Sequence, residues 1–172
     1  LSSGILLYGL SLIFAFTNST DFFEISNVIN SSIQNNTNFL IINSGFILVL
    51  CGLFFKIAIV PFHMWAPDVY EGSPTPITAY FTTIPKIGAI AFLIKFLNIP
   101  FQGYTDTWVQ ILYLVSVASM ILGSVAAINQ YNIKRLLAYS SISHVGFMLI
   151  GVLTANQIGI KSLQLYIFIY LI

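Results

Sequence analysis

Long apolar stretches separated by short polar segments constrain this sequence more than any other feature. An α-helix needs about 20 mainly apolar residues to cross the roughly 30 Å hydrocarbon core of a bilayer. The sequence predicts about five or six such helices, of which the second is broken at Pro61 and the last is truncated: residues 1–16, 39–67, 76–97, 108–128, 134–153 and 161–172. The Ser- and Asn-rich residues 17–38 are expected to form a connection.

The composition agrees with a membrane protein. Of the 172 residues, 58% are hydrophobic and 6% are charged, whereas about 25% are charged in a typical soluble protein. So few charged side chains cannot cover the surface of a soluble globule. We therefore expect an all-α integral membrane protein, a helical bundle with residues 1–172 forming a single transmembrane domain.

Charge, cysteine content and motifs exclude several classes of function. A formal net charge of +1 provides no basic stripe for binding nucleic acid. Cys51 is the only cysteine, so it has no partner for a disulfide or a four-ligand zinc site. The sequence has no glycine-rich phosphate loop, CxxC or HExxH motif. No metal and no bound cofactor are therefore expected in this chain.

Lys56 is the first candidate functional residue, because an ionised side chain at the bilayer centre costs about 2.5–3.5 kcal/mol. If the span runs from residue 45 to 67, Lys56 lies halfway along it. Pro61 would break this span by removing a backbone donor, and the freed carbonyls need protein or water at membrane depth. Alternatively, the helix ends at Pro61 and Lys56 extends to the lipid headgroups.

Lys86 is the second candidate, in the middle of residues 76–97. Its amine is too far from either helix end to reach water easily, whereas Lys95 is close to the end. The preceding Pro85 should kink the helix and leave the carbonyl of Phe81 without its usual partner. A lysine that has lost its water gives up its proton more readily than one in solution. Lys86 is therefore expected to store and pass a proton.

His144 is the third candidate, near the centre of residues 134–153. Four hydroxyl side chains accompany it: Tyr139, Ser140, Ser141 and Ser143. It is either a hydrogen-bonded packing residue or a proton carrier. The second role is possible because an unperturbed histidine has a pKa of about 6.5 and can take up and release protons near neutral pH. Together with Lys56 and Lys86, it predicts a transmembrane proton relay.

Other charged residues are expected at the membrane surface. Asp68 and Glu71 precede a segment rich in Gly, Ser and Pro, residues 72–76, and are expected to lie in a turn. Lys134 and Arg135 begin a later helix and are expected to anchor it at the interface on the same side of the membrane as the two acids.

Four motifs closely resemble the antiporter-like membrane subunits of respiratory complex I. They are FKIAIVPFHMWAPDVYEGSPTPITA at residues 55–79, IPKI at 84–87, SMILG at 119–123 and IKRLLAYSSISHVG at 133–146. The core of the first motif is shared by the sister subunits, whereas its continuation VYEGSPTP and the lysine after Pro85 are similar to subunit 2. The resemblance covers most of the chain from about Leu53.

This resemblance implies a proton-translocating membrane-arm subunit of NADH:ubiquinone oxidoreductase. It implies Lys56 as the lysine of the broken helix, Lys86 as the central lysine of the next helix and His144 in the continuing polar axis, with helix breaks at Pro61 and Pro85. NADH, FMN, iron–sulfur clusters and ubiquinone are then expected in partner subunits. The implied partners are other membrane-arm subunits and the lipid bilayer, in the mitochondrial inner membrane or a bacterial-type energy-transducing membrane.

The sequence departs from the family pattern in two places. A glutamate that pairs with the first lysine on an earlier helix, and a basic residue on a later broken helix, are both missing. Because the sequence starts at Leu1 and its last apolar stretch is short, a fragment or a split subunit is expected, with a second polypeptide as one source of the missing helices. Two other functions remain open: a structural or assembly subunit without its own proton path, and a cation/proton antiporter.

Overall fold

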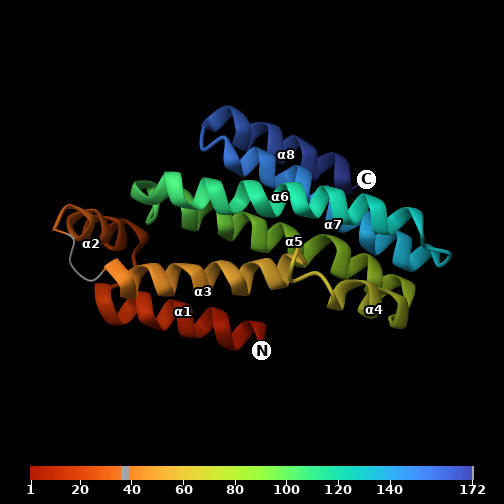
Figure 1. Ribbon diagram of the computed structural model, residues 1–172, viewed down its shortest axis with the longest axis horizontal. Helices are drawn as coiled ribbons and strands as arrows, with labels where there is room; N and C mark the ends of the chain where they lie inside the picture. Colours follow the sequence, from red (N-terminus) through yellow and green to blue (C-terminus); the bar gives the residue numbers. More distant parts are fainter. Residues whose placement is uncertain (36–38, 172) are drawn as a thin grey trace.

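The computed structural model describes residues 1–35 and 39–171, and helices form nearly all of this part (Figure 1). A single 3-10 turn, η1, accompanies eight α-helices in the described residues: α1 Ser2–Thr17, α2 Phe22–Asn35, α3 Phe39–Ile57, α4 Trp65–Gly72, α5 Thr75–Asn98, η1 Gln102–Tyr104, α6 Thr105–Ile128, α7 Ile133–Leu153 and α8 Gln157–Leu171. This all-helical architecture confirms the predicted fold class.

Three of the helical stretches are long and apolar enough to cross a membrane: Thr75–Asn98, Gln102–Ile128 and Ile133–Leu153. The pair Ser2–Thr17 and Phe22–Ser32 also qualifies when taken together, although its two helices are bent by 69°. The apolar part of α3, Ile41–Ile57, is shorter. By length and composition, the described residues therefore contain three candidate spans, or four if the bent pair is one span.

The segment expected to be a connection contains α2, and this prediction was wrong. Ile25 and Ile29 lie four residues apart on one face of α2 and are buried, as in an amphipathic helix. Asp21 stabilises its start, because the Asp21 Oδ1 atom accepts a hydrogen bond of 3.1 Å from the backbone N–H of Phe23. The Ser and Asn residues on the other face lowered the hydropathy enough to conceal the helix.

The break after α3 occurs earlier than expected. α3 ends at Ile57, four residues before Pro61, where Ala58 adopts a positive φ of 62°. Such a left-handed residue is a common way to end a helix. The carbonyl of Phe55, in the last turn of α3, accepts from the backbone N–H of Ala58 at 3.2 Å and also from the indole N–H of Trp65 at 2.9 Å.

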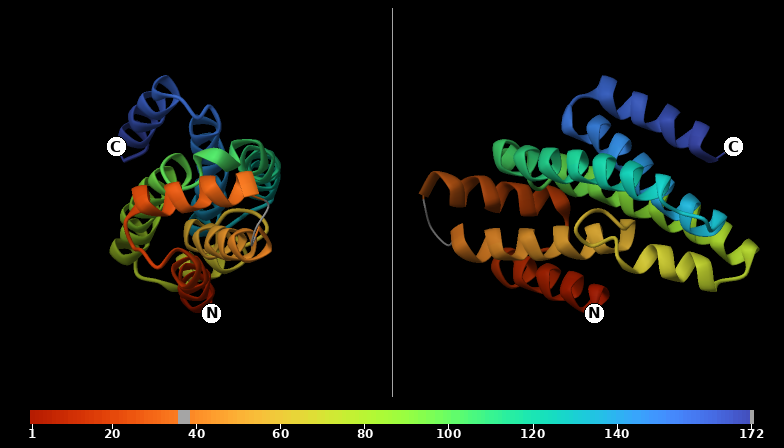
Figure 2. Two further views of the ribbon diagram at one scale, coloured as in Figure 1. Left: turned by 90° about the vertical axis from the view of Figure 1, so that its left-hand side faces the viewer. Right: turned by 45° about the vertical axis from the view of Figure 1, so that its right-hand side comes forward.

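A second helix follows the break and corrects another prediction. α4 runs from Trp65 to Gly72, so Asp68 and Glu71 lie on a helix and not in a turn. The short link of residues 73–74 then leads directly into α5. Figure 2 shows α4 beside the start of α5, at the far end of the molecule from α2.

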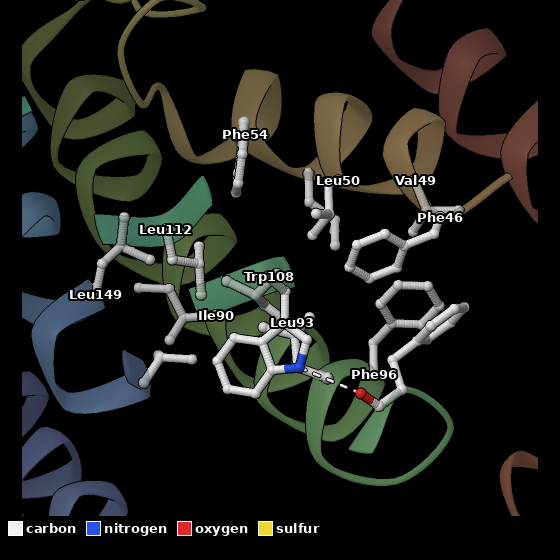
Figure 3. Packing of buried hydrophobic residues seen from close by; sticks show 14 of the residues in the cluster. Phe46, Val49, Leu50, Phe54, Ile90, Leu93, Phe96, Trp108, Leu112 and Leu149 are labelled. Carbon is white, nitrogen blue, oxygen red and sulfur yellow. Dashed lines mark hydrogen bonds between the residues drawn. The ribbon is translucent and has the colours of Figure 1, made fainter. Parts of the chain in front are cut away.

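The main apolar core lies between α3, α5 and α6 (Figure 3). Phe46 of α3 stacks on Phe96 of α5, with ring centroids 6.1 Å apart. Trp108 of α6 is 1% exposed, and its indole N–H donates to the carbonyl of Phe101 at 3.2 Å. Burying this indole is favourable because its polar atom has a partner. The core holds α5 in a fixed position relative to α3 and α6.

α7 packs along α6 through small residues (Figure 1). At Gly123 of α6, an added Cβ atom would lie only 2.7 Å from the backbone nitrogen of Ser143. At Gly146 of α7, it would lie 2.9 Å from the carbonyl oxygen of Ser116. Close approach over small residues is typical of helix pairs in membranes. α8 lies alongside α7 at the edge of the bundle.

Candidate functional site

Lys86 lies at the centre of the candidate site. It is near the middle of α5, and 2% of its surface is exposed. Its Nζ atom donates a hydrogen bond of 2.5 Å to the hydroxyl of Ser141 on α7, and it lies 5.7 Å from the centroid of the Tyr70 ring on α4. Three helices therefore meet at one buried amine, which has the polar partner that burial requires.

Pro85 shapes the backbone of α5 directly before Lys86. Because proline has no N–H, it cannot bond to the carbonyl four residues earlier, that of Phe81. The hydroxyl of Tyr70 donates to this carbonyl at 3.3 Å. The carbonyl that the sequence predicts to be free is therefore bonded from α4.

His144 joins the same polar cluster from α7. Its Nδ1 atom lies 2.8 Å from the hydroxyl of Tyr166 on α8, and its ring centroid lies 5.4 Å from that of Tyr170. Which atom of the first pair donates depends on the imidazole tautomer. Lys86 is near enough to interact with His144 electrostatically. The structure thus brings two of the three predicted relay residues into one cluster.

A groove of ≈ 760 Å³ opens beside this cluster, between α5, α7 and α8. Its polar lining includes Thr78, Thr82, Ser140, Ser141, His144 and Tyr166. Hydroxyl and imidazole groups both donate and accept hydrogen bonds. A wall of this kind can hold water molecules and exchange protons with them.

Lys56 lies apart from the cluster. It is exposed in the last turn of α3 and lines a second groove of ≈ 700 Å³. Within residues 1–35 and 39–171, no hydrogen bond or ion pair joins it to Lys86. Pro85, the residue before Lys86, lines the same groove. A role for Lys56 at the centre of the membrane stays a prediction.

The predicted surface charges lie together at one end of the bundle. Arg135, at the start of α7, forms ion pairs with Asp68 and Glu71 on α4. The contact with Glu71 places Nε 2.5 Å from Oε2 but lacks hydrogen-bond geometry. Lys134 donates to the carbonyl of Ser73 at 2.7 Å. These contacts hold α4 against α7, which the interpretation as separate interfacial anchors did not anticipate.

Three tyrosines of the site were missed by the sequence interpretation: Tyr70, Tyr166 and Tyr170. Tyr166 and Tyr170 each carry a hydroxyl in the apolar residues 165–171, and that signal could have identified them, whereas Tyr70 lies between Asp68 and Glu71 and has no such signal. Among the described residues, no group of three or more His, Cys, Asp or Glu side chains could hold a metal ion.

Comparisons with known proteins agree with this architecture. Residues 1–172 match the family model described as NADH:quinone oxidoreductase/Mrp antiporter, TM. NADH-quinone oxidoreductase subunit N of Pelagibacter ubique is 51% identical over 172 residues, which are 100% of this chain and 35% of that protein. The chain therefore spans about a third of the length of this relative.

Solved structures give the same result. The structure of respiratory complex I from Thermus thermophilus with bound aureothin contains a chain that is 34% identical, with a TM-score of 0.71 over 96% of this chain and 34% of that one. The Mrp complex from Dietzia sp. matches in fold, with a TM-score of 0.85, 24% identity and coverage of 99% of this chain and 30% of that one. The chain belongs to the NADH:quinone oxidoreductase/Mrp antiporter transmembrane family.

Proposed function

We propose that this chain forms part of a proton-translocating membrane-arm subunit of an NADH:quinone oxidoreductase. The observation that carries the proposal is the burial of the Lys86 amine in the middle of an apolar helix, bonded to a hydroxyl of a second helix. A charged group in such a place is expensive and is typical of proton pathways. An apolar residue at position 86 would serve a purely structural helix better.

Lys86 holds a proton and exchanges it through its neighbours. Its Nζ atom donates to Ser141, and His144, one turn along α7, bonds to Tyr166. Water in the groove beside Ser141 and His144 completes the path between these groups. A change of charge near Lys86 drives the transfer, because charges interact strongly where little water screens them.

The partners and the location follow from the same proposal. NADH oxidation and quinone reduction occur in partner subunits that carry FMN, iron–sulfur clusters and quinone. Other membrane-arm subunits pack beside this chain in an energy-transducing membrane. The relative and the complex I structure described above are bacterial, so a mitochondrial inner membrane gains no support from them.

Substitution of Lys86 tests the proposal. Lys86→Met keeps the length and apolar stem of the side chain but removes the amine. In the assembled complex, we expect normal NADH:quinone electron transfer chemistry at the redox centres with a sharply lower number of protons pumped per electron. Lys95→Met is the matched control, because Lys95 is exposed near the end of the same helix.

Full pumping by the assembled Lys86→Met complex would refute the proposal. Loss of assembly in Lys86→Met, with normal assembly in Lys95→Met, would instead favour the structural-subunit alternative. Sodium-dependent proton exchange by the chain reconstituted alone would favour the antiporter alternative.

A further inference from the structure

Tyr70 is fully buried, although it belongs to the short helix α4, whose neighbouring Asp68 and Val69 are exposed. Its side chain turns away from that exposed face and toward α5. There it meets α5 in two places: its hydroxyl bonds to the carbonyl of Phe81, and its ring lies beside the Lys86 amine.

The first contact fixes the backbone of α5. Pro85 leaves the carbonyl of Phe81 without its helical partner, and an unpaired carbonyl at membrane depth would favour rearrangement of the helix at this point. The Tyr70 hydroxyl supplies the missing partner at 3.3 Å. The turn of α5 that leads into Lys86 is therefore tied to α4.

The second contact acts on the side chain of Lys86. The face of an aromatic ring carries partial negative charge and attracts a cation within about 6 Å of its centroid. The Lys86 Nζ atom lies 5.7 Å from the centroid of the Tyr70 ring. One residue therefore holds both the backbone before Lys86 and the end of its side chain.

Tyr70 is itself held in place from several sides. The ring of Trp65 packs against it edge-on, with centroids 6.4 Å apart and an interplanar angle of 88°. The hydroxyl of Thr78 donates to the backbone carbonyl of Tyr70 at 3.3 Å. α4 is also bound to α7 through Arg135, so Tyr70 is held by contacts within α4 and by contacts of α4 with α5 and α7.

We propose that Tyr70 is the positioning residue of Lys86: its hydroxyl replaces the hydrogen bond that Pro85 removes from α5, and its ring holds the amine in register with Ser141. This inference rests on the proposed proton-transfer role of Lys86. The hydroxyl of Tyr70 also lies close to the hydroxyl of Ser141, which accepts the hydrogen bond of the Lys86 amine.

A double-mutant cycle between Tyr70 and Pro85 tests the hydroxyl. Tyr70→Phe keeps the ring and removes the hydroxyl, while Pro85→Ala restores a backbone N–H that can bond to Phe81. In the assembled complex, we expect Tyr70→Phe alone to lower the protons pumped per electron, because losing such a hydrogen bond reduces the population of the ordered α5 backbone by about fivefold. In the Pro85→Ala background, the same substitution should have little effect, because the carbonyl no longer needs the hydroxyl.

Matched variants complete the design. Tyr80→Phe removes a tyrosine hydroxyl from an exposed position of α5 and should leave pumping unchanged. Tyr70→Leu removes the ring as well and should lower pumping further, even in the Pro85→Ala background.

If Pro85→Ala itself does not pump, the same cycle is measured on the melting temperature of the solubilised complex. If Tyr70→Phe does not assemble, rescue of assembly by Pro85→Ala supports the proposal, and failure of the double variant to assemble overturns it.

Equal effects of Tyr70→Phe with and without Pro85 would overturn the proposal, and so would unchanged pumping by Tyr70→Phe. The result for Lys86→Met separates this failure from that of the proposed function. If Lys86→Met abolishes pumping while Tyr70→Phe pumps normally, only the role of Tyr70 is wrong. If Lys86→Met pumps fully, the proton-transfer role itself fails.

Discussion

Replacing Gly123 by alanine should force α6 and α7 apart. The added Cβ atom would lie 2.7 Å from the backbone nitrogen of Ser143 and 2.9 Å from the carbonyl oxygen of Tyr139. These are backbone atoms of a helix, so they cannot rotate away as a side chain can. Relieving the shorter contact requires a shift of about 0.7 Å, and a gap of this size forfeits a quarter to a half of the attraction between facing atoms.

The expected loss of stability follows from a matched substitution. Gly88 of α5 is exposed, and a Cβ atom added there would meet nothing within 4 Å. Both substitutions gain the same helix propensity of about 1 kcal/mol, so the difference between them isolates the clash. Overpacking typically costs about 1–3 kcal/mol. We therefore expect Gly123→Ala to be less stable than Gly88→Ala by that amount.

Thermal unfolding of the detergent-solubilised protein measures this difference. For a chain of this size, each kcal/mol corresponds to about 2–4 °C in melting temperature. Gly123→Ala should melt below Gly88→Ala by several degrees, and Gly88→Ala should melt at or above the unsubstituted protein. Equal melting temperatures for the two variants would refute the close packing of α6 on α7 at Gly123.

Two further predictions concern the polar contacts of α7. Ser141→Ala removes the hydroxyl that accepts the hydrogen bond of Lys86, so the assembled complex should pump fewer protons per electron. Ser124→Ala, at an exposed position of α6, should leave this ratio unchanged. Equal pumping ratios in the two variants would contradict the role of Ser141. Arg135→Gln removes both ion pairs to α4 and should lower the melting temperature slightly at low salt, but hardly at high salt, because these exposed charges are screened. A deficit that persists at high salt would show that more than the ion pairs was lost.

Much of the helical framework could be predicted from local sequence. Residues 76–97 and 134–153 were expected as helices and correspond to Thr75–Asn98 and Ile133–Leu153. These segments are mainly apolar over a length that fits a bilayer, so their length and overall hydropathy identify them. α2 escaped detection because half of its surface is polar, and its apolar face becomes apparent only where it packs on the rest of the bundle.

The break between α3 and α4 includes Pro61, but it begins earlier in the sequence, at Ala58. Pro61 is a clear signal for the end of a helix, yet Ala58 already leaves the helical conformation. The carbonyl of Phe55 is bonded by Trp65, ten residues away. The earlier end of α3 is therefore stabilised by a contact that exists only after α4 has folded back, and no local pattern announces it.

The sequence by itself determined that this chain is helical and apolar and that Lys86 lies in the middle of a membrane-length helix. Only the tertiary structure decided which groups meet that lysine, since Ser141 is 55 residues away in the sequence and Tyr70 belongs to another helix. A helix that is apolar on every side has no sequence pattern that distinguishes its lipid-facing side from its packed side. Close packing over small residues such as Gly123 selects the contacting faces, and with them the neighbours of the buried amine.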